Sequence, residues 1–441
     1  MKLIETIRNI WKIEDLKSRI LTTIGLVLVY RLGSFIVLPG IDPTQLSALK
    51  DQTAEGVMGL LDMFSGGAFS NASIFGLGIM PYISASIVIQ LLGIAVPYFQ
   101  RLQREGESGR RKINQITRYL TVIILLFQSP AYLANLPDVA VSSNGLMFRI
   151  TSIVILTAGT MFVMWLGERI TEKGIGNGIS LIIMIGIIAR LPFAAVAEFV
   201  SRLEEGGGLV MLLIEIVVLF FVFAGTILLV QGTRRIPVQY AKRIVGNKQY
   251  GGVRQYIPLK VNAAGVMPII FAQAIMFVPI TLAGYVGDGG NSWFTSMFAD
   301  FTGIGYNVTF AFLIIAFTYF YTAITINPTQ MAEDMKRNGG FIPGVKPGKK
   351  TVDFLDSVMS KITLPGSVFL ALVAILPAFA MIAGVDRMFA QFYGGTSLLI
   401  LVGVVLDTLQ QIESHLLMRH YDGLMKSGRI KGRTGGGPAV Y

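Results

Sequence analysis

The side chains of this sequence that are capable of chemistry are few and widely separated. The chain has no cysteine, so disulfides, thiolate nucleophiles and Cys-based metal sites are excluded. Its two histidines, His415 and His420, lie close together near the C-terminus, where surface or interfacial side chains are a better interpretation than a two-ligand metal site. The sequence has no GxxxxGK[ST], HExxH or GxSxG motif, and no close pair of carboxylates lies beside a nucleophile in an apolar stretch. We therefore expect neither enzyme activity nor a cofactor.

A second group of candidates is polar residues inside long apolar stretches, which are functional candidates by default. They are Arg31, Gln128, Glu215 and Asp407. They are scattered and form no proton relay or ion cage, as a secondary transporter of a small solute would require. That transporter is nevertheless the alternative function. The Gly-Ile-Gly-Asn-Gly run at 174–178 lacks the spacing of a dinucleotide fingerprint, and we interpret it as the flexible start of a helix.

The third candidate feature is an aliphatic stripe. Ile79, Ile83 and Ile87 follow one another at intervals of four residues, so they share one face of a helix. Such stripes usually face lipid or a protein core. Other residues of the same stretch indicate contacts that are not simple hydrocarbon; they are Pro81, Ser84, Ser86 and Gln90.

The segment 62–73, Asp-Met-Phe-Ser-Gly-Gly-Ala-Phe-Ser-Asn-Ala-Ser, allows two interpretations. It is too short and too rich in Gly and Ser to cross a membrane, so one interpretation is an ordinary external loop. Its apolar residues Met63, Phe64 and Phe69 suit open solvent poorly, so the other is a short helix folded back into a cavity. Irregular backbone at membrane depth is tolerated only where protein or a water-filled space surrounds it.

The elements that must position these residues are membrane-spanning helices. Of the residues 53% are apolar and only 14% charged, whereas soluble domains carry about 25% charged residues. A bilayer core of about 30 Å requires roughly 20 apolar residues. Ten stretches qualify, and we predict an all-α membrane protein. The stretches are 20–37, 74–96, 120–136, 150–166, 179–191, 209–230, 263–285, 308–326, 362–382 and 397–417.

The distribution of positive charge predicts the orientation. The net charge is +11, and most Lys and Arg residues fall in the termini and in the loops 97–119, 167–178, 231–262 and 327–361, all on one side of the ten spans. Lys and Arg are retained in cytoplasmic loops, so both termini are expected in the cytoplasm. The six exceptions are Arg31, Lys50, Arg149, Arg190, Arg202 and Arg387.

Ten spans divide naturally into two halves of five, related by inverted topology because an odd number of spans flips the second copy. We expect a cytoplasmic amphipathic helix over 1–19, an N-terminal half over 20–203, a C-terminal half over 204–417 and a cytoplasmic tail over 418–441. The long basic loops 231–262 and 327–361 either fix topology and touch anionic lipids, or form protruding hairpins that dock a large soluble partner.

Taken together, several stretches resemble the bacterial SecY family, whose members are the central subunits of the general protein translocation channel. Examples are Met-Phe-Ser-Gly-Gly at 63–67, Leu-Gly-Ile-Met-Pro-Tyr-Ile-Ser-Ala-Ser-Ile at 77–87 and Arg-Glu-Gly-Glu-Ser-Gly-Arg-Arg-Lys at 104–112. The others are at 33–36, 39–42, 164–180, 259–268, 341–348 and 394–400. The resemblance covers nearly the whole chain in order, and no single motif carries it.

The resemblance implies a role for each part of a central hourglass pore. A constriction ring is implied for Ile79, Ile83, Ile183, Ile270 and Ile400. The segment 62–73 becomes a plug, chiefly through Met63, Phe64, Ser65, Gly66, Gly67 and Phe69. A lateral gate is implied between the second and seventh spans, with Ser84, Ile87, Gln90 and Val278. The two basic loops become docking sites for a motor or ribosome, through Arg234, Arg235, Lys242, Arg243 and Lys346.

The implied function is a channel that translocates unfolded polypeptides and releases transmembrane segments sideways into lipid. The implied location is the bacterial cytoplasmic membrane, which the chain crosses many times. The implied partners are SecE, SecG, the SecA motor, the ribosome, the translocating polypeptide with its signal sequence, and anionic lipids, with no nucleic acid other than ribosomal RNA. Many bacterial relatives have Arg where this chain has Lys346; the two are not equivalent at a bidentate site.

Overall fold

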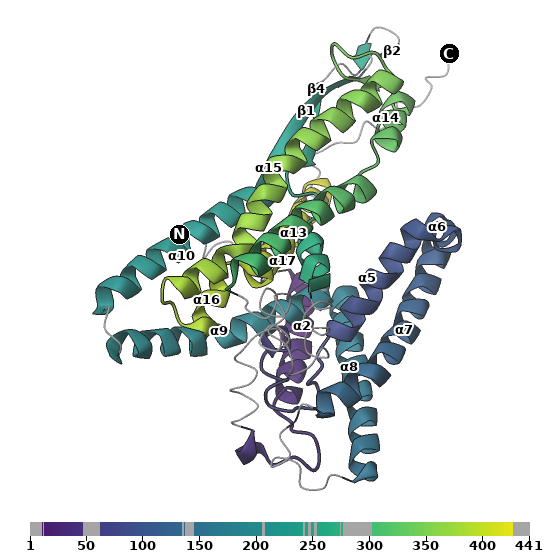
Figure 1. Ribbon diagram of the computed structural model, residues 1–441. Coiled ribbons are helices and arrows are strands. Elements are labelled where there is room, and N and C mark those ends of the chain that lie inside the picture. The colour runs from purple at the N-terminus through teal and green to yellow at the C-terminus, as the bar shows by residue number, and fades with distance from the viewer. Residues whose placement is uncertain are drawn as a thin grey trace.

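A computed structural model describes residues 11, 13–46, 62–134, 136, 145–204, 208–240, 243–245, 248–250, 254–273, 275–276 and 302–426. Helices dominate these ranges (Figure 1). Most of the predicted amphipathic helix over 1–19, part of the predicted seventh span and the end of the C-terminal tail lie outside the described residues.

The N-terminal part forms a bundle of long helices: α2 (Glu14–Gly33), α5 (Met80–Ala95), α6 (Pro97–Arg104), α7 (Glu107–Ala134), α8 (Leu146–Lys173) and α9 (Gly178–Glu204). Helices α5 and α6 meet at an angle of 101°. Val96 between them is extended and precedes Pro97, as expected because the residue before proline disfavours helical geometry.

The C-terminal part contains α10 (Gly208–Gln231), α13 (Ile304–Thr325), α14 (Pro328–Arg337), α15 (Lys349–Ile382), the short α16 (Arg387–Ala390) and α17 (Gly395–Lys426). Short 3-10 helices occur at Pro43–Gln45 (η1) and Gln391–Tyr393 (η3). In Figure 1, α13, α14 and α15 form one arm with the strands, while α5, α6 and α7 form another.

Among the described residues, seven helices are long and apolar enough to cross a membrane, or eight when the bent pair α5–α6 is taken as one span. The first predicted span corresponds to α2, which begins at Glu14 in charged sequence. The predicted span 179–191 is only the first half of α9, which continues past Pro192 to Glu204. The apolar stretches therefore located the helices but not their ends. Helices α7 and α15 begin inside the basic loops, whereas α5 begins only at Met80 within the predicted span 74–96 and α2 ends at Gly33, before the predicted end at 37.

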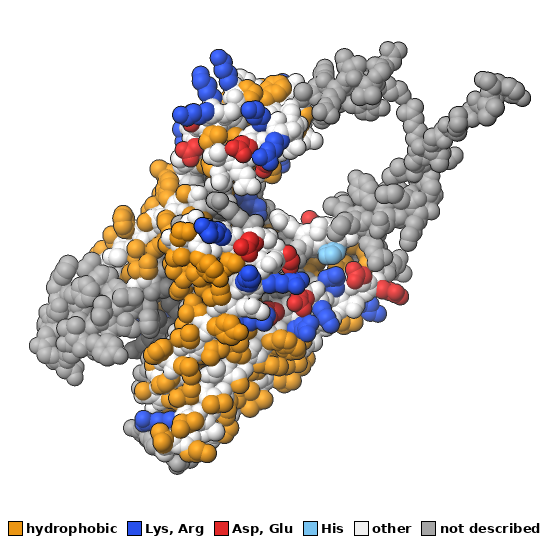
Figure 2. Space-filling model, turned by 90° about the vertical axis from the view of Figure 1, so that its right-hand side faces the viewer, with side chains coloured by type: hydrophobic (Ala, Val, Ile, Leu, Met, Phe, Trp, Pro, Cys, Tyr) orange, Lys and Arg blue, Asp and Glu red, His pale blue; other side chains and the backbone are white. Residues whose placement is uncertain are grey.

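The surface of these helices suits lipid contact. Of the residues in the most apolar stretch of α10 only 11% are buried, against 50% in α15. Helix α10 is therefore peripheral and α15 central. Figure 2 shows an apolar expanse over the lower part of the molecule and Lys, Arg, Asp and Glu gathered above it. A large exposed apolar surface in a folded protein marks contact with membrane or partner.

The long basic loops contain strands rather than unstructured chain. The sheet order is β4–β1–β5, with β1 (Thr233–Tyr240) antiparallel to β4 (Arg254–Lys260) and to β5 (Gly340–Phe341). A separate hairpin pairs β2 (Arg243–Val245) with β3 (Lys248–Tyr250). One face of the larger sheet packs on α14 and α15 through a core that includes Ile236, Val238, Leu259, Met335 and Leu355. Strands β1 and β4 of the first basic loop and β5 of the second thus form one structured unit with α14.

The outer edge of β4 has no strand partner among the described residues. Val261 donates its N–H to the Gly232 carbonyl at 2.8 Å, so alternate residues of β4, including Pro258, face away from β1. Pro258 has no N–H, and edge strands commonly use proline in this way. This edge borders a groove of about 490 Å³ lined by β4 and the start of α14.

The Gly-rich run at 174–178 is fixed in place, contrary to the flexible start interpreted from the sequence. Gly174, Ile175 and Gly176 are buried. The Ile175 N–H donates to Thr23 Oγ1 of α2 at 3.1 Å, and the Gly176 N–H donates to Gln411 Oε1 of α17 at 2.9 Å. Glycine at 176 has φ +82°, which favours a residue without Cβ, and the run contacts both α2 and α17.

Candidate functional site

The segment that follows the undescribed residues 47–61 is buried inside the N-terminal bundle. Every residue from Asp62 to Ser70 is buried, and only the first three are helical. Gly66 and Gly67 have φ values of +64° and +90°, which glycine adopts without steric penalty. Ser73 forms an isolated bridge with Val37 beyond the end of α2. The segment is therefore a folded-back turn surrounded by protein.

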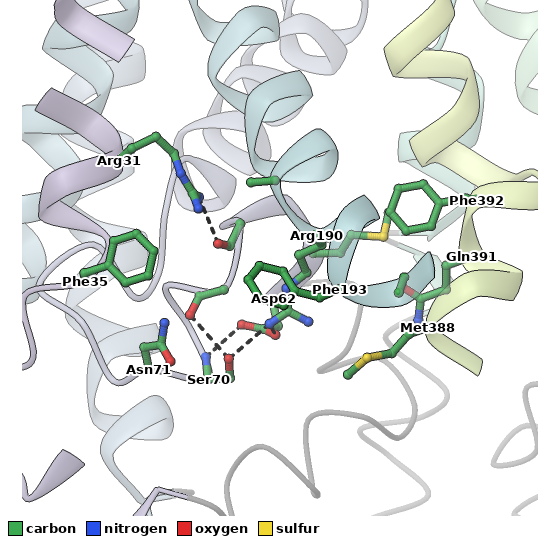
Figure 3. A pocket seen from close by; sticks show the side chains of 15 residues that line it. Arg31, Phe35, Asp62, Ser70, Asn71, Arg190, Phe193, Met388, Gln391 and Phe392 are labelled. Atoms are coloured by element: carbon green, nitrogen blue, oxygen red, sulfur yellow. Dashed lines mark hydrogen bonds and ion pairs between the residues drawn. The ribbon is translucent and has the colours of Figure 1, made fainter. Parts of the chain in front are cut away.

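One side chain of α9 holds both ends of the turn (Figure 3). The Arg190 guanidinium forms an ion pair with the Asp62 carboxylate and donates to Ser70 Oγ at 3.1 Å. The Ser70 N–H donates to Asp62 Oδ1 at 2.8 Å. The Asp62 side chain is 1% exposed and that of Arg190 26%, so the carboxylate is enclosed while its cationic partner retains contact with solvent.

Helices α2 and α7 bind the backbone of the turn. Tyr30 Oη donates to the Ser65 carbonyl at 3.0 Å and Arg31 Nη1 donates to the Gly66 carbonyl at 3.0 Å. From α7, Tyr132 Oη donates to the Phe69 carbonyl at 2.8 Å. These bonds satisfy carbonyls that would otherwise be buried without partners.

The turn also approaches α9 more closely than a side chain would allow. A Cβ added at Gly186 would lie 2.9 Å from the Phe64 carbonyl oxygen and 3.1 Å from the Gly66 nitrogen. Similarly, a Cβ at Gly159 of α8 would overlap the Ile74 carbonyl oxygen. Both helices therefore present glycine where the irregular backbone packs against them.

A cavity of about 320 Å³ lies beside the turn. Its walls come from α2, the turn, α9 and the α16–η3 connection, as Figure 3 shows. The charged side chains that line it are Arg31, Asp62 and Arg190, so the lining carries one excess positive charge. The other labelled lining residues are Phe35, Ser70, Asn71, Phe193, Met388, Gln391 and Phe392.

The isoleucines singled out from the sequence come mostly to one place. Ile79, Ile183 and Ile400 belong to one buried apolar cluster, and Ile83 packs against it. The cluster also contains Met63 and Phe64 of the turn. Among the described residues, this cluster does not include Ile270, which is half-buried on the helical residues 267–273. The turn, the start of α5, α9 and α17 thus converge here.

The predicted gate residues are only partly described. On α5, Ile87 is buried, and Ser84 and Gln90 are half-buried. Gln90 Nε2 donates to Ser86 Oγ at 3.4 Å, within the helix. Val278 lies outside the described residues.

The predicted docking residues lie on or near the strands. Arg234 and Arg235 are exposed on β1, and Lys346 is exposed in the turn before α15, where its carbonyl accepts from Thr351 Oγ1 at 3.0 Å. The backbone of Arg243 belongs to β2, and Lys242 lies outside the described residues.

Sequence reasoning missed a buried charge cluster between α9 and α10. Arg202 Nε donates to Glu198 Oε1 at 2.8 Å and its Nη2 donates to the Gly384 carbonyl at 2.7 Å. Arg202 also forms an ion pair with Glu215, while Glu198 Oε2 accepts the Asp386 N–H at 2.6 Å. This arrangement ties α9 and α10 to the α15–α16 connection.

The four polar candidates inside apolar stretches therefore lie in different surroundings. Arg31 binds the turn, and Glu215 belongs to the charge cluster. Gln128 and Asp407 are exposed. Among the described residues, no group of three or more His, Cys, Asp or Glu side chains could hold a metal ion.

Sequence reasoning also gave no role to Arg190, which was counted only as an external positive charge. The available signal was an arginine inside an apolar run, together with an aspartate at the start of the Gly- and Ser-rich segment. Nothing in their spacing indicates that they pair.

The known proteins whose sequences resemble this chain belong to one family. A family model described as SecY matches residues 73–409. The protein translocase subunit SecY of Escherichia coli K12 is 43% identical over 428 residues, which cover 95% of this chain and 96% of that protein. The corresponding subunit of Mycobacterium bovis is 41% identical over 434 residues, covering 93% and 97%.

Solved structures give the same fold. A SecY structure, reported for a plug domain that stabilises the closed state of the translocation channel, superposes with a TM-score of 0.62 at 18% identity. It covers 90% of this chain and 92% of that one. Sec61 in a canine ribosome–channel complex from the endoplasmic reticulum superposes with a TM-score of 0.59 at 16% identity, with the same coverage. The described helices thus belong to the fold of these membrane channels.

Proposed function

We propose that this chain, which belongs to the SecY family, forms a channel that conducts unfolded polypeptides across the bacterial cytoplasmic membrane. Its bacterial relatives are named protein translocase subunits, and it shares the fold of protein-conducting channels. The single observation that carries the proposal is the convergence of isoleucines from α9, α17 and the start of α5 over a buried folded-back turn.

The isoleucine cluster suits a seal for unfolded chains. A channel that passes every kind of side chain cannot rely on directional polar contacts, because these would retain some substrates. Flexible aliphatic side chains exclude water by dewetting and yield to a passing chain without bonding it. The ring of this proposal is Ile79, Ile83, Ile183, Ile270 and Ile400. Burial of three of these residues in one cluster, with Ile83 against it, supports the seal.

The turn 62–73 acts as the plug of this proposal. Its burial against the isoleucine cluster supports this role, because a closed channel requires folded polypeptide that fills the pore beneath a narrow seal. Withdrawal of the turn leaves the polypeptide path open, and the channel needs no catalytic group for this step.

We further propose that transmembrane segments of the translocating polypeptide leave the channel sideways into lipid, between α5 and the predicted span that contains Val278. At about −0.3 to −0.6 kcal/mol per central Leu, Ile, Phe or Val, some 20 such residues gain roughly 6–12 kcal/mol in lipid. One central Asp or Arg subtracts about 3 kcal/mol. Total hydrophobicity therefore decides between export and insertion.

The unit of β1, β4, β5 and α14 serves as the docking surface for a cytoplasmic partner. It carries the exposed side chains of Arg234 and Arg235 on β1 and of Lys346 beside it, and basic surfaces attract acidic proteins, ribosomal RNA and anionic lipids. The partners of this proposal are SecA, the ribosome, SecE and SecG, with both termini cytoplasmic. Solved relatives in ribosome complexes support the choice of partner.

Reconstituted vesicles test the function. We expect ATP-dependent uptake of an unfolded precursor when the SecA motor is added, whereas gradient-coupled flux of a small solute without polypeptide transport would favour the transporter instead.

Single-channel conductance tests the seal. Ile83→Gly and Ile183→Gly are expected to raise ion leak in planar bilayers. Leu370→Gly is the control, because Leu370 of α15 is fully buried in a different apolar cluster. Equal leak from Leu370→Gly and Ile183→Gly would contradict the ring assignment.

A further inference from the structure

The contacts that keep the turn 62–73 in place are of two kinds. Tyr30, Arg31 and Tyr132 donate to its backbone carbonyls, and such bonds do not depend on the side chains of the turn. The Asp62–Arg190 pair is different, because it is the one ion pair between the turn and the helices within the described ranges. Its strength depends on one charge from each partner.

The position of this pair gives it leverage over the whole turn. Asp62 begins the turn and accepts from the Ser70 N–H, and Arg190 also donates to Ser70 Oγ. A single guanidinium on α9 therefore holds both ends of the 62–70 loop. The Gly66–Gly67 corner lies between Arg190 and Arg31; a Cβ on Gly67 would be 3.5 Å from Arg190 Nη2.

The surroundings of the pair allow it to separate reversibly. The cavity of about 320 Å³ borders Arg190, and the Arg190 side chain is 26% exposed. Water in this cavity can hydrate the guanidinium when the carboxylate withdraws. Asp62, by contrast, is enclosed in place, so it is stable there only while its charge is paired.

We propose that Arg190 and Asp62 form a latch that holds the turn in its buried position and so determines how readily the channel opens. Both are positioning residues, because they act through the turn and not on the passing chain. The proposal rests on the proposed channel function and adds to it the residues that set the opening threshold. A weakened latch lowers the hydrophobicity that a segment needs to open the channel.

The latch predicts a specific order of effects. Arg190→Gln leaves a buried carboxylate without its cation, the most destabilising way to break a buried pair. Asp62→Asn removes the charge but keeps an oxygen for the Ser70 N–H, so its effect is smaller. The double variant Arg190→Gln/Asp62→Asn has no unpaired carboxylate, and its turn is therefore held better than in Arg190→Gln alone.

The absence of cysteine from the chain permits a direct measurement in membranes that contain the full-length protein. Ala68→Cys places a thiol on the turn, where the native side chain is fully buried. Ala374→Cys in the core of α15 is the reference site. A membrane-impermeant maleimide added from the external side, without any polypeptide substrate, labels Cys only when local opening exposes it.

We expect Arg190→Gln to speed labelling at position 68 by roughly tenfold or more, as loss of one partner of a buried pair implies, while position 374 stays protected. The double variant is expected to label more slowly than Arg190→Gln alone. Arg118→Gln is the control, because it breaks the Arg118–Glu168 pair of α7 and α8 and touches no part of the turn; its labelling rate at position 68 should equal that of the parent.

Unchanged labelling at position 68 in Arg190→Gln would overturn the latch. So would a double variant that labels as fast as Arg190→Gln. If Arg190→Gln exposes position 374 as well, Asp62→Asn decides: faster labelling at 68 alone supports the latch, and equal change at both sites or at neither overturns it. Labelling that follows the expected order in vesicles that import no precursor would leave the latch standing and refute the channel function.

Discussion

The contact between Gly186 and the buried turn gives the sharpest prediction. In Gly186→Ala the new methyl group would lie 2.9 Å from the Phe64 carbonyl oxygen and 3.1 Å from the Gly66 nitrogen. These neighbours are backbone atoms, so they cannot rotate away. Because α9 is a continuous helix and the turn is irregular, we expect the turn to move and α9 to remain in place.

The magnitude follows from two opposing effects. Ala stabilises a helix interior over Gly by about 1 kcal/mol, so the bundle itself does not weaken. Crowding of the turn costs about 1–3 kcal/mol, which lowers the ratio of buried to displaced turn by about 5- to 150-fold. We therefore expect a large rise in ion leak with an unchanged or slightly higher midpoint of thermal unfolding.

The assay compares Gly186→Ala with Gly225→Ala in planar bilayers without substrate. Gly225 lies in α10, where a new Cβ would meet only the Phe369 ring at 3.4 Å, an ordinary contact, so this variant gains helix propensity without displacing anything. If both variants leak equally, or if Gly186→Ala lowers the midpoint of thermal unfolding, the reasoning is wrong.

Three further variants test other contacts. Tyr132→Phe removes the hydroxyl that donates to the Phe69 carbonyl and should destabilise the buried turn by about 1–3 kcal/mol, measurable as increased leak at unchanged helix content. Leu259→Ala in the core under the sheet should cost about 2–5 kcal/mol and speed proteolysis of the loops without raising leak; a parallel rise in leak would show that the sheet and the seal are coupled. Thr23→Val deprives the Ile175 N–H of its acceptor and should lower the unfolding midpoint, whereas an unchanged midpoint would mean that another group satisfies this N–H.

Hydrophobic patterning was enough to predict a helical membrane protein and the centres of most spans. It failed at helix ends, because apolar length reflects the thickness of the membrane and not the length of the helix. Helix α15 starts at Lys349, well before its apolar stretch. For the basic loops, protruding hairpins were one of two alternatives, and the strands agree with it; the strand bounds were not predicted, because in β1 only Ile236 and Val238 alternate as buried residues.

The candidate site was less accessible to sequence reasoning. Spacing placed Ile79 and Ile83 on one helical face but gave no reason to join them with Ile183 and Ile400; the family resemblance supplied that grouping. The partner of Asp62 was missed because the two charges of a long-range pair leave no periodic signal. The same limit applies to the cluster around Arg202, whose members come from elements that only the tertiary fold brings together.

Within the described part of the chain the outer edge of β4 has no strand partner, and the position of Pro258 on this edge matters in a protein that handles unfolded chains. An unpaired strand edge is a template on which any extended peptide can add a further strand, and nascent or unfolded substrates are extended peptides. At Pro258 the edge offers a carbonyl but no N–H, so a peptide that pairs with this edge loses one backbone hydrogen bond at that position. The proline therefore makes this edge a poorer template for strand addition by an extended substrate.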